Sequence, residues 1–217
     1  MDVVLASNNK NKYREIKEIL KKFRLRCFSL ADAGIDIDID ETGETLKENA
    51  AIKARAVRNL IKDKIIIADD TGLEVDYLAG APGVYSARFA GPECSYLDNN
   101  IKLLKIMRGV PKNQRKAVFK TVIHIIFPDG YEKSVIGKVK GLITENMRGE
   151  NGFGYDPVFY LPSLKKTYAE LNLSQKNKVS HRMQAICAAG KLINSYLKKY
   201  STQINAVVFK TPFTNGK

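Results

Sequence analysis

The chain has 217 residues, of which 44% are hydrophobic and 27% charged, a balance typical of a compact globular protein and not of a disordered or fibrous one. Lys and Arg number 36 against 23 for Asp and Glu, and the formal net charge of +13 favours an anionic partner. Nucleic acid, an acidic membrane face and nucleotide phosphates all qualify, and a solvated basic surface fits the same charge. Local patterns must decide between them.

The cysteines and the first residues indicate where the protein works. Cys27, Cys94 and Cys187 lie far apart, which argues against a disulfide framework, a zinc site or a redox pair and predicts ordinary buried thiols. The chain passes from Met1 directly into a strand-like run, and no stretch approaches the roughly 18 apolar residues of a membrane span. We therefore expect no signal peptide, no membrane partner and a cytoplasmic location.

A predicted strand, Val3 to Ala6, is followed by a polar loop and a helix. The helix carries an apolar stripe made of Tyr13, Ile16, Leu20 and Phe23. The loop, Ser7-Asn8-Asn9-Lys10-Asn11-Lys12, predicts an anion site, because helical N–H groups and the helix dipole point at it. The loop lacks the glycine spacing of a Walker A motif, and it fits a plain Asn-capped helix start equally well.

The next segment alternates strictly: Asp36-Ile37-Asp38-Ile39-Asp40-Glu41. Alternation of this kind predicts a strand with three carboxylates on one face and the isoleucines on the other. Such an acidic face either meets solvent, where its charges block aggregation at a sheet edge, or faces a metal ion.

A helix is predicted from about Glu44 to Ile61, with one apolar stripe made of Leu46, Ala50, Val57 and Leu60. Lys53 lies in the middle of that stripe, whereas the other charged residues occupy the opposite face. An unpaired ammonium is costly to bury, so Lys53 needs an anionic partner. A ligand, a structural carboxylate, or solvent reached by extending the side chain would each satisfy it.

A buried strand, Ile65 to Ala68, is predicted to end in Asp69-Asp70-Thr71-Gly72. Ligand sites in α/β sheets lie beyond the C-terminal ends of strands, and these oxygens suit a hard cation. Adjacent carboxylates point opposite ways if the strand continues, so one of the two is then structural. The loop from Gly80 to Arg88 that follows is glycine-punctuated, basic and long enough to be functional.

The second half contains a predicted antiparallel hairpin, because Ala117 to Phe127 and Tyr131 to Val139 flank an Asp-Gly turn. Together with the alternating strands and helices before it, the hairpin predicts an α/β fold with a mixed sheet. A last helix is predicted from about Ser180 to Tyr200, and residues 201–217 show no clear period.

Two segments near the C-terminus carry residue types that bind ligands. Gly152-Phe153-Gly154-Tyr155-Asp156-Pro157 offers a base-sized stacking surface with close backbone access, or a tight turn with buried rings. Ser180 fits the N-cap of the last helix and would place His181 and Arg182 in its first turn. With Lys176 before them, both can donate to an anion or to a carbonyl oxygen.

In this order and wording the motifs resemble the inosine triphosphate pyrophosphatase family, which hydrolyses deaminated purine triphosphates. The resemblance runs from about Val3 to Lys198 and is carried by Ala6 to Lys12, Glu41 to Gly43, Glu48 to Ala50, Lys53 to Arg55, Ala68 to Leu73, Gly83 to Arg88, Gly152 to Pro157 and Ser180 to Arg182. It implies an elongated α/β fold over residues 1–200, with two lobes, a central mixed sheet flanked by helices and an active site between the lobes. A homodimer is also implied, and residues 201–217 form a C-terminal extension.

The resemblance also implies roles for individual residues. The triphosphate would be bound by Ser7, Asn8, Asn9, Lys10, Asn11, Lys12 and Lys53. Asp70 would bind Mg²⁺ and act as the catalytic acceptor, and Thr71 would contact the substrate. The base and sugar would be surrounded by Phe153, Gly154, Tyr155, Asp156, Lys176, His181 and Arg182. The family usually has Glu where this chain has Asp40, so the second metal carboxylate is either Asp40 or Glu41.

The implied activity is Mg²⁺-dependent hydrolysis of ITP, dITP and XTP to monophosphate and pyrophosphate, which removes them from the nucleotide pool. A basic nucleic-acid-binding protein is the alternative from another class, but the chain has no RRM, KH or helix-turn-helix signature, so we expect no specific nucleic acid partner. A pyrophosphatase acting on modified pyrimidines is the nearer alternative, and Ser180-His181-Arg182 argues against it.

Overall fold

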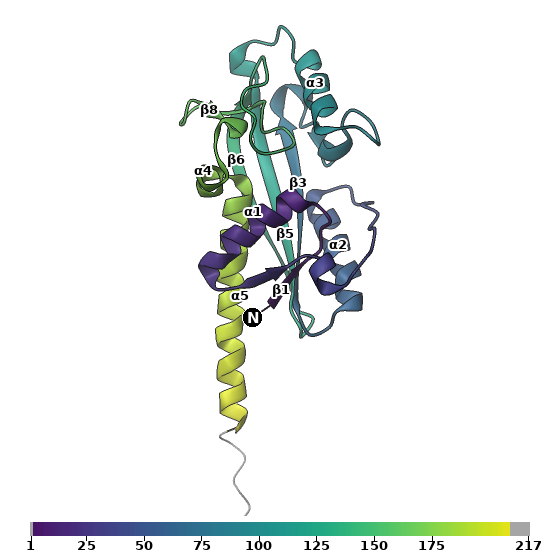
Figure 1. Ribbon diagram of the computed structural model, residues 1–217, viewed down its shortest axis with the longest axis vertical. Helices are drawn as coiled ribbons and strands as arrows, with labels where there is room; N and C mark the ends of the chain where they lie inside the picture. The colour runs from purple at the N-terminus through teal and green to yellow at the C-terminus, as the bar shows by residue number, and fades with distance from the viewer. Residues whose placement is uncertain (1, 209–217) are drawn as a thin grey trace, which may run out of the picture.

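A computed structural model describes residues 2–208 and arranges them around one mixed sheet with helices packed against it (Figure 1). The strands are β1 (Asp2–Leu5), β2 (Arg26–Phe28), β3 (Ile65–Val75), β4 (Pro82–Gly83), β5 (Lys116–Ile126), β6 (Glu132–Ile143), β7 (Phe159–Leu161) and β8 (Lys166–Thr167). The helices are α1 (Lys10–Leu20), α2 (Leu46–Leu60), α3 (Tyr96–Ile106), α4 (Leu173–Val179) and α5 (His181–Val208). The strand order is β2-β1-β3-β5-β6-β7-β8, with β4 paired to β3. The pairs β1·β2 and β1·β3 are parallel and the others antiparallel, which confirms a mixed sheet.

The strand β3 is much longer than the four residues predicted for it. It continues from Ile65 through the two aspartates to Val75 and pairs with β5 along its length, from Ile66↔Ile126 to Val75↔Ala117. The backbone groups after Ala68 are therefore bonded within the sheet, so the prediction that the strand ends there is wrong. The aspartates lie in the middle of a strand and point to opposite faces of the sheet.

Helices cover both faces of the sheet in its first half. One face packs against α1 and α5 through a cluster that includes Ile16, Ile123 and Ala189. Ala54 and Val57 of α2 belong to a second cluster, which includes Ile66. The close approach of α5 to β6 depends on Gly137, because a Cβ there would lie 2.1 Å from the His181 carbonyl oxygen.

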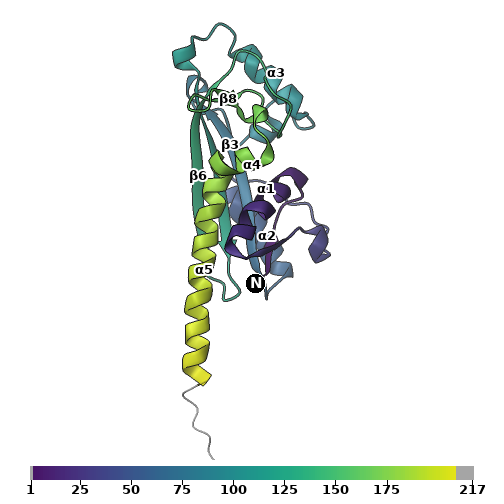
Figure 2. The same cartoon turned by 60° about the vertical axis from the view of Figure 1, so that its left-hand side comes forward.

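The second half of the sheet has a hydrophobic cluster of its own. Leu73 and Phe119 on the long strands pack there with Tyr168 and with Leu103 and Met107 from the α3 region. We call the part around α1 and α2 the first lobe and the part around α3, β7 and β8 the second lobe. Figures 1 and 2 show the long strands running through both lobes, which gives the elongated two-lobed α/β shape implied by the resemblance.

The predicted acidic strand at residues 36–40 does not form. The alternation itself is correct, since the three aspartates are exposed and the isoleucines pack against the cluster around Ile66. The segment is nevertheless a loop, because no strand pairs with it in the described chain, and the Ile37 carbonyl oxygen accepts instead from Asn8 Nδ2 at 3.0 Å.

Other expectations about the helices and cysteines need smaller corrections. Leu60 is 58% exposed because it lies at the C-terminal end of α2, where the chain turns towards β3. The helix α5 begins after Ser180 as predicted, with Met183 N donating to Ser180 Oγ at 3.1 Å, but it continues to Val208. Residues 209–217 of the expected C-terminal extension lie outside the described chain. All three cysteines are free, but only Cys27 is buried. Between residues 2 and 208, no helix combines the length and the apolar character needed to cross a bilayer.

Candidate active site

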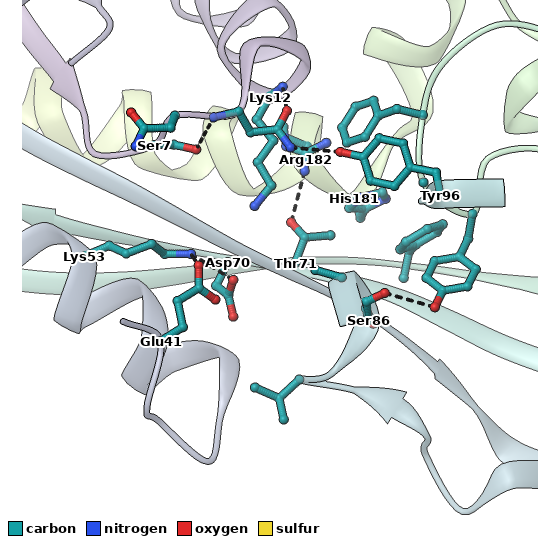
Figure 3. A pocket seen from close by; sticks show the side chains of 18 of the residues that line it. Ser7, Lys12, Glu41, Lys53, Asp70, Thr71, Ser86, Tyr96, His181 and Arg182 are labelled. Atoms are coloured by element: carbon teal, nitrogen blue, oxygen red, sulfur yellow. Dashed lines mark hydrogen bonds and ion pairs between the residues drawn. The ribbon is translucent and has the colours of Figure 1, made fainter. Parts of the chain in front are cut away.

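A cavity of about 300 Å³ lies between the two lobes and gathers most of the predicted site residues (Figure 3). Those that line it are Ser7, Asn8, Asn9, Lys12, Glu41, Lys53, Asp70, Thr71, Phe153, Gly154, Tyr155, Asp156, Lys176, His181 and Arg182. The predicted residues Lys10, Asn11 and Asp40 are not among its lining. In Figure 3 the group of Glu41, Lys53 and Asp70 occupies one end, and Tyr96 and His181 lie towards the other.

The loop after β1 both caps the helix α1 and lines the cavity. Asn9 is the N-cap of α1, since its Oδ1 accepts from Asn11 N at 3.0 Å and from Lys12 N at 3.1 Å. These two helical N–H groups are therefore bonded to the protein itself. The loop still lines the cavity, and Lys12 Nζ lies 3.3 Å from Asp69 Oδ1. Burial lowers the pKa of Lys12, an effect that Asp69 opposes.

Lys53 points into the protein from α2, as the helical stripe predicts, and its anionic partners are carboxylates. A capping box of Thr45 and Glu48 begins this helix. Lys53 Nζ lies 2.9 Å from Glu41 Oε1 and 2.9 Å from Asp70 Oδ1. Burial would lower the pKa of Lys53, but Asp70, Asp69 and Glu41 raise it above its usual value, so the ammonium stays charged.

The same two carboxylates suit a hard divalent cation. Asp70 Oδ2 is buried and has no hydrogen-bond partner in the described chain, so it is free to take a ligand. Glu41 lines the cavity with its side chain 32% exposed, whereas Asp40 lies outside the lining. Among residues 2–208 no three His, Cys, Asp or Glu side chains converge into a preformed metal cluster. Two carboxylates supplemented by substrate phosphates and water are a typical ligand set for Mg²⁺.

Asp69, on the other face of β3, is the structural member of the aspartate pair. Lys12 and Arg182 both contact its carboxylate, the latter at 3.3 Å from Nη2 to Oδ2. Burial would raise the pKa of Asp69, but Lys12, Arg182 and Lys53 lower it to about 2. Asp69 is thus ionised beneath the cavity, and the two aspartates point to opposite faces of the sheet, as expected for a strand that continues.

The far end of the cavity is built on a buried network of ion pairs. Glu15, which is 2% exposed, binds Lys176 at 2.7 Å and Arg182 at 2.5 Å. Lys176 also pairs with Asp156, whose Oδ2 accepts from Phe153 N at 2.8 Å. Arg182 donates further to Asp69 and to Thr71 Oγ1. The network fixes two cations and the loop at residues 153–156 in one arrangement.

Aromatic rings cover these cations. Lys176 Nζ lies 4.7 Å and the Arg182 guanidinium carbon 5.5 Å from the Phe153 ring centroid. The His181 ring stacks on Phe119, with centroids 4.4 Å apart and planes 12° apart. Burial lowers the pKa of His181 well below its usual value, and Arg182, Lys176 and Lys12 add to the effect. His181 therefore carries no charge at neutral pH.

Several lining residues were not singled out from the sequence. Leu30, Tyr96 and Phe119 lie outside every candidate segment. The others belong to candidate segments but were given no individual role: Asp38 and Ile39 lie in the alternating segment, and Val84, Ser86 and Ala87 lie in the loop from Gly80 to Arg88. Ser86 fixes the loop after β4, since its Oγ donates to Gly83 O at 2.6 Å and accepts from Leu73 N at 2.8 Å. Tyr96 is the first residue of α3, and a Ser-x-x-Asp capping box at Ser95 was the available signal for that helix. Glu15, behind the lining, was also missed, although it adjoins Ile16 on the buried side of α1.

Known proteins are similar to this chain in sequence and in fold over most of its length. A family model described as the Ham1 family matches residues 3–191. The dITP/XTP pyrophosphatase of Thermoanaerobacter pseudethanolicus is 51% identical over 199 residues, which cover 92% of this chain and 98% of that protein. The Ham1 protein of Staphylococcus aureus is 40% identical with a TM-score of 0.79, and covers 90% of this chain and 100% of its own. A HAM1 protein from Coxiella burnetii is 36% identical with a TM-score of 0.80, and the match covers 90% of this chain and 99% of that protein.

Proposed function

Because the chain belongs to the Ham1 family, we propose that it is a nucleoside triphosphate pyrophosphohydrolase that converts dITP, ITP and XTP to monophosphate and pyrophosphate. One observation carries the proposal: a single cavity has a lysine between two carboxylates at one end and cations beneath an aromatic ring at the other. The first end suits a triphosphate with its metal ion, and the second suits a polar base.

At the phosphate end, Ser7, Asn8, Asn9, Lys12 and Lys53 bind the triphosphate. Lys10 and Asn11 do not contact the triphosphate under this proposal, since neither lines the cavity. Glu41 and Asp70 would hold Mg²⁺, and of the two residues considered for the second carboxylate only Glu41 lines the cavity. When bound, Mg²⁺ supplies Lewis-acid stabilisation of charge on the phosphate oxygens.

Asp70 also accepts a hydrogen bond from the attacking water, and it takes up the proton of that water as the water oxygen bonds to the α-phosphorus and the bond to pyrophosphate breaks. That contact orients the water for attack on the α-phosphorus, and the lysines neutralise charge that develops on the departing pyrophosphate. In the ligand-free protein the surrounding carboxylates raise the pKa of Lys53, so its ammonium is charged before the triphosphate binds.

At the base end, Phe153 stacks on the purine and Arg182 donates to the base edge under this proposal, which is supported by the position of both residues in the cavity lining. Hypoxanthine and xanthine carry an oxygen at the 6-position, where adenine carries an amino group. Arg182 is a permanent donor, so it favours the oxygen. A site built on such a hydrogen bond rejects an analogue that lacks the acceptor by roughly 10⁴-fold. Removal of the donor with Arg182→Ala should narrow the ratio of ITP to ATP turnover, and an unchanged ratio would assign Arg182 to structure alone.

The enzyme works as a homodimer in the cytoplasm under this proposal, as the family resemblance implies. Sedimentation equilibrium of the full chain tests the dimer, and a monomer at micromolar concentration would remove that part of the proposal.

The test of the proposed function is a panel of nucleoside triphosphates incubated with and without Mg²⁺. We expect turnover of dITP, ITP and XTP far above that of ATP and CTP, with loss of activity in a chelator. Equal turnover of all bases would contradict the assigned substrate class. Activity that persists without divalent cations would contradict the role of Glu41 and Asp70 as metal ligands.

A further inference from the structure

Tyr96 bridges the two lobes at the cavity, although the proposed chemistry needs no group at that position. It is the first residue of α3 in the second lobe, and its hydroxyl accepts from Asn9 Nδ2 of the first lobe at 3.1 Å. Its ring packs against Phe153, with centroids 5.9 Å apart and planes inclined at 45°. One side chain thus contacts both the phosphate loop and the ring assigned to the base.

Both contacts are held in place by neighbouring groups. The Asn9 side chain uses its oxygen to cap α1, so its orientation is fixed and its amide nitrogen is directed at the Tyr96 hydroxyl. Asn100, one turn further along α3, donates to Tyr96 O and to Gly154 O, each at 2.8 Å. The start of α3 is therefore fixed to the loop that carries Phe153. Because Tyr96 and Phe153 lie too close to admit a base between them, the tyrosine supports the stacking ring and does not form a second stacking face.

We propose that Tyr96 is a positioning residue that couples the base end of the cavity to the triphosphate end. This inference rests on the proposed function. The hydroxyl holds Asn9 and its loop in the arrangement that receives the phosphates, while the ring holds Phe153 where the base stacks. A nucleotide that contacts both ends meets a preorganised pocket, and the affinity gained by that preorganisation appears in KM and not in kcat.

The two contacts can be removed separately. Tyr96→Phe deletes the bond to Asn9 and keeps the ring, so we expect the KM for ITP to rise about threefold to tenfold with kcat changed less than twofold. Tyr96→Ala also deletes the support for Phe153 and should raise this KM by a further factor of about three to ten. Inorganic tripolyphosphate, which has no base, should inhibit both variants equally weakly relative to the unaltered enzyme.

The matched control is Tyr77→Phe, which removes the same atom from a tyrosine of the second lobe that is 52% exposed and does not line the cavity. We expect its KM and kcat to be unchanged. An unaltered or lowered KM for ITP in Tyr96→Phe would overturn the inference. A fall in kcat at unchanged KM would also overturn it, because that change follows from a lost transition-state contact or from a smaller fraction of folded enzyme.

A second readout does not depend on turnover. In the ligand-free protein, loss of the hydrogen bond between Asn9 and Tyr96 should speed hydrogen exchange about threefold or more at the amides of Asn11, Lys12 and Tyr13, which are bonded to Asn9. Equal exchange in Tyr96→Phe and the unaltered protein would refute the coupling even if no triphosphate is hydrolysed. If no triphosphate is a substrate but exchange is faster in Tyr96→Phe, the proposed function is refuted while the coupling through Tyr96 is supported.

Discussion

Lys53 Nζ lies 2.9 Å from Asp70 Oδ1 within the cavity, and both side chains are more than nine-tenths buried. The lysine reaches this position from the apolar stripe of α2, and the aspartate from the middle of β3. A buried ion pair of this kind adds little to stability, because desolvation offsets the attraction. Its position in a cavity with one unpartnered carboxylate oxygen supports the proposed role of the pair in catalysis.

Replacement of Lys53 by Met keeps the apolar stem and deletes the charge. We expect kcat for ITP to fall about 10²-fold or more, on the scale of one lost transition-state contact. The control is Lys47→Met on the exposed face of the same helix, which should leave kcat unchanged. A Lys53→Met enzyme that keeps most of its activity and gains stability would show that the lysine binds no phosphate.

Asp70 and Asp69 should respond differently to the same substitution. Asp70→Asn removes a metal-facing charge at constant volume, so turnover should nearly vanish while the protein remains folded. Asp69→Asn leaves Lys12 without its buried partner and leaves Arg182 with Glu15 alone, and the free energy of unfolding should fall by about 3–5 kcal/mol. Kinetics and urea titrations of both variants distinguish the two roles, and near-normal activity in a well-folded Asp70→Asn protein would remove Asp70 from the mechanism.

Stability should depend on pH through His181. Burial holds its folded-state pKa well below the unfolded value of about 6.5, so the unfolded chain binds the proton more tightly. The free energy of unfolding is then constant above about pH 6.5 for this group and falls as pH decreases, by up to about 1.4 kcal/mol per pH unit. Urea unfolding between pH 7.5 and 5 should show a shallower decline in His181→Gln than in the unaltered protein. Identical slopes would show that the imidazole accepts a proton freely in the folded state.

Arg182 should stabilise the fold far more than an arginine in a surface pair. Its guanidinium is 1% exposed and binds Glu15 and Asp69, so Arg182→Ala removes one of the two cationic partners of each buried carboxylate and should cost about 3–5 kcal/mol of unfolding free energy. Arg148, paired with Glu170 and 44% exposed, is the matched control, and Arg148→Ala should cost no more than about 1 kcal/mol. An equal loss of unfolding free energy in the two variants would contradict a stabilising role for the ion-pair network around Glu15.

The parts of the fold that the sequence predicts are those with strong local periodicity. The hairpin of β5 and β6, the inward position of Lys53 and the cap at Ser180 each follow from one short pattern, and each is confirmed. The acidic segment at residues 36–40 shows the limit of such patterns. Alternation fixes which side chains face outwards, but a strand also needs a partner, and partners are set by topology.

The residues of the candidate site also divide into those that a local sequence pattern identifies and those that it does not. Residues that carry charge in an unusual local context, such as Lys53 and Asp70, can be identified from the chain alone. Glu15 and Tyr96 act through partners more than 80 positions away, Arg182 and Asn9, so no local pattern indicates their roles. The positions of Asp40 outside the cavity and of Glu41 inside it likewise depend on how the loop packs.

The central claim is that water attacks the α-phosphorus of a deaminated purine triphosphate and releases pyrophosphate. Hydrolysis of ITP in H₂¹⁸O with Mg²⁺, followed by mass spectrometry of the products, tests it most directly. We predict IMP and pyrophosphate in equal amounts, with one ¹⁸O atom in the IMP phosphate and none in pyrophosphate. Formation of IDP and orthophosphate, or ¹⁸O in pyrophosphate, would contradict the account.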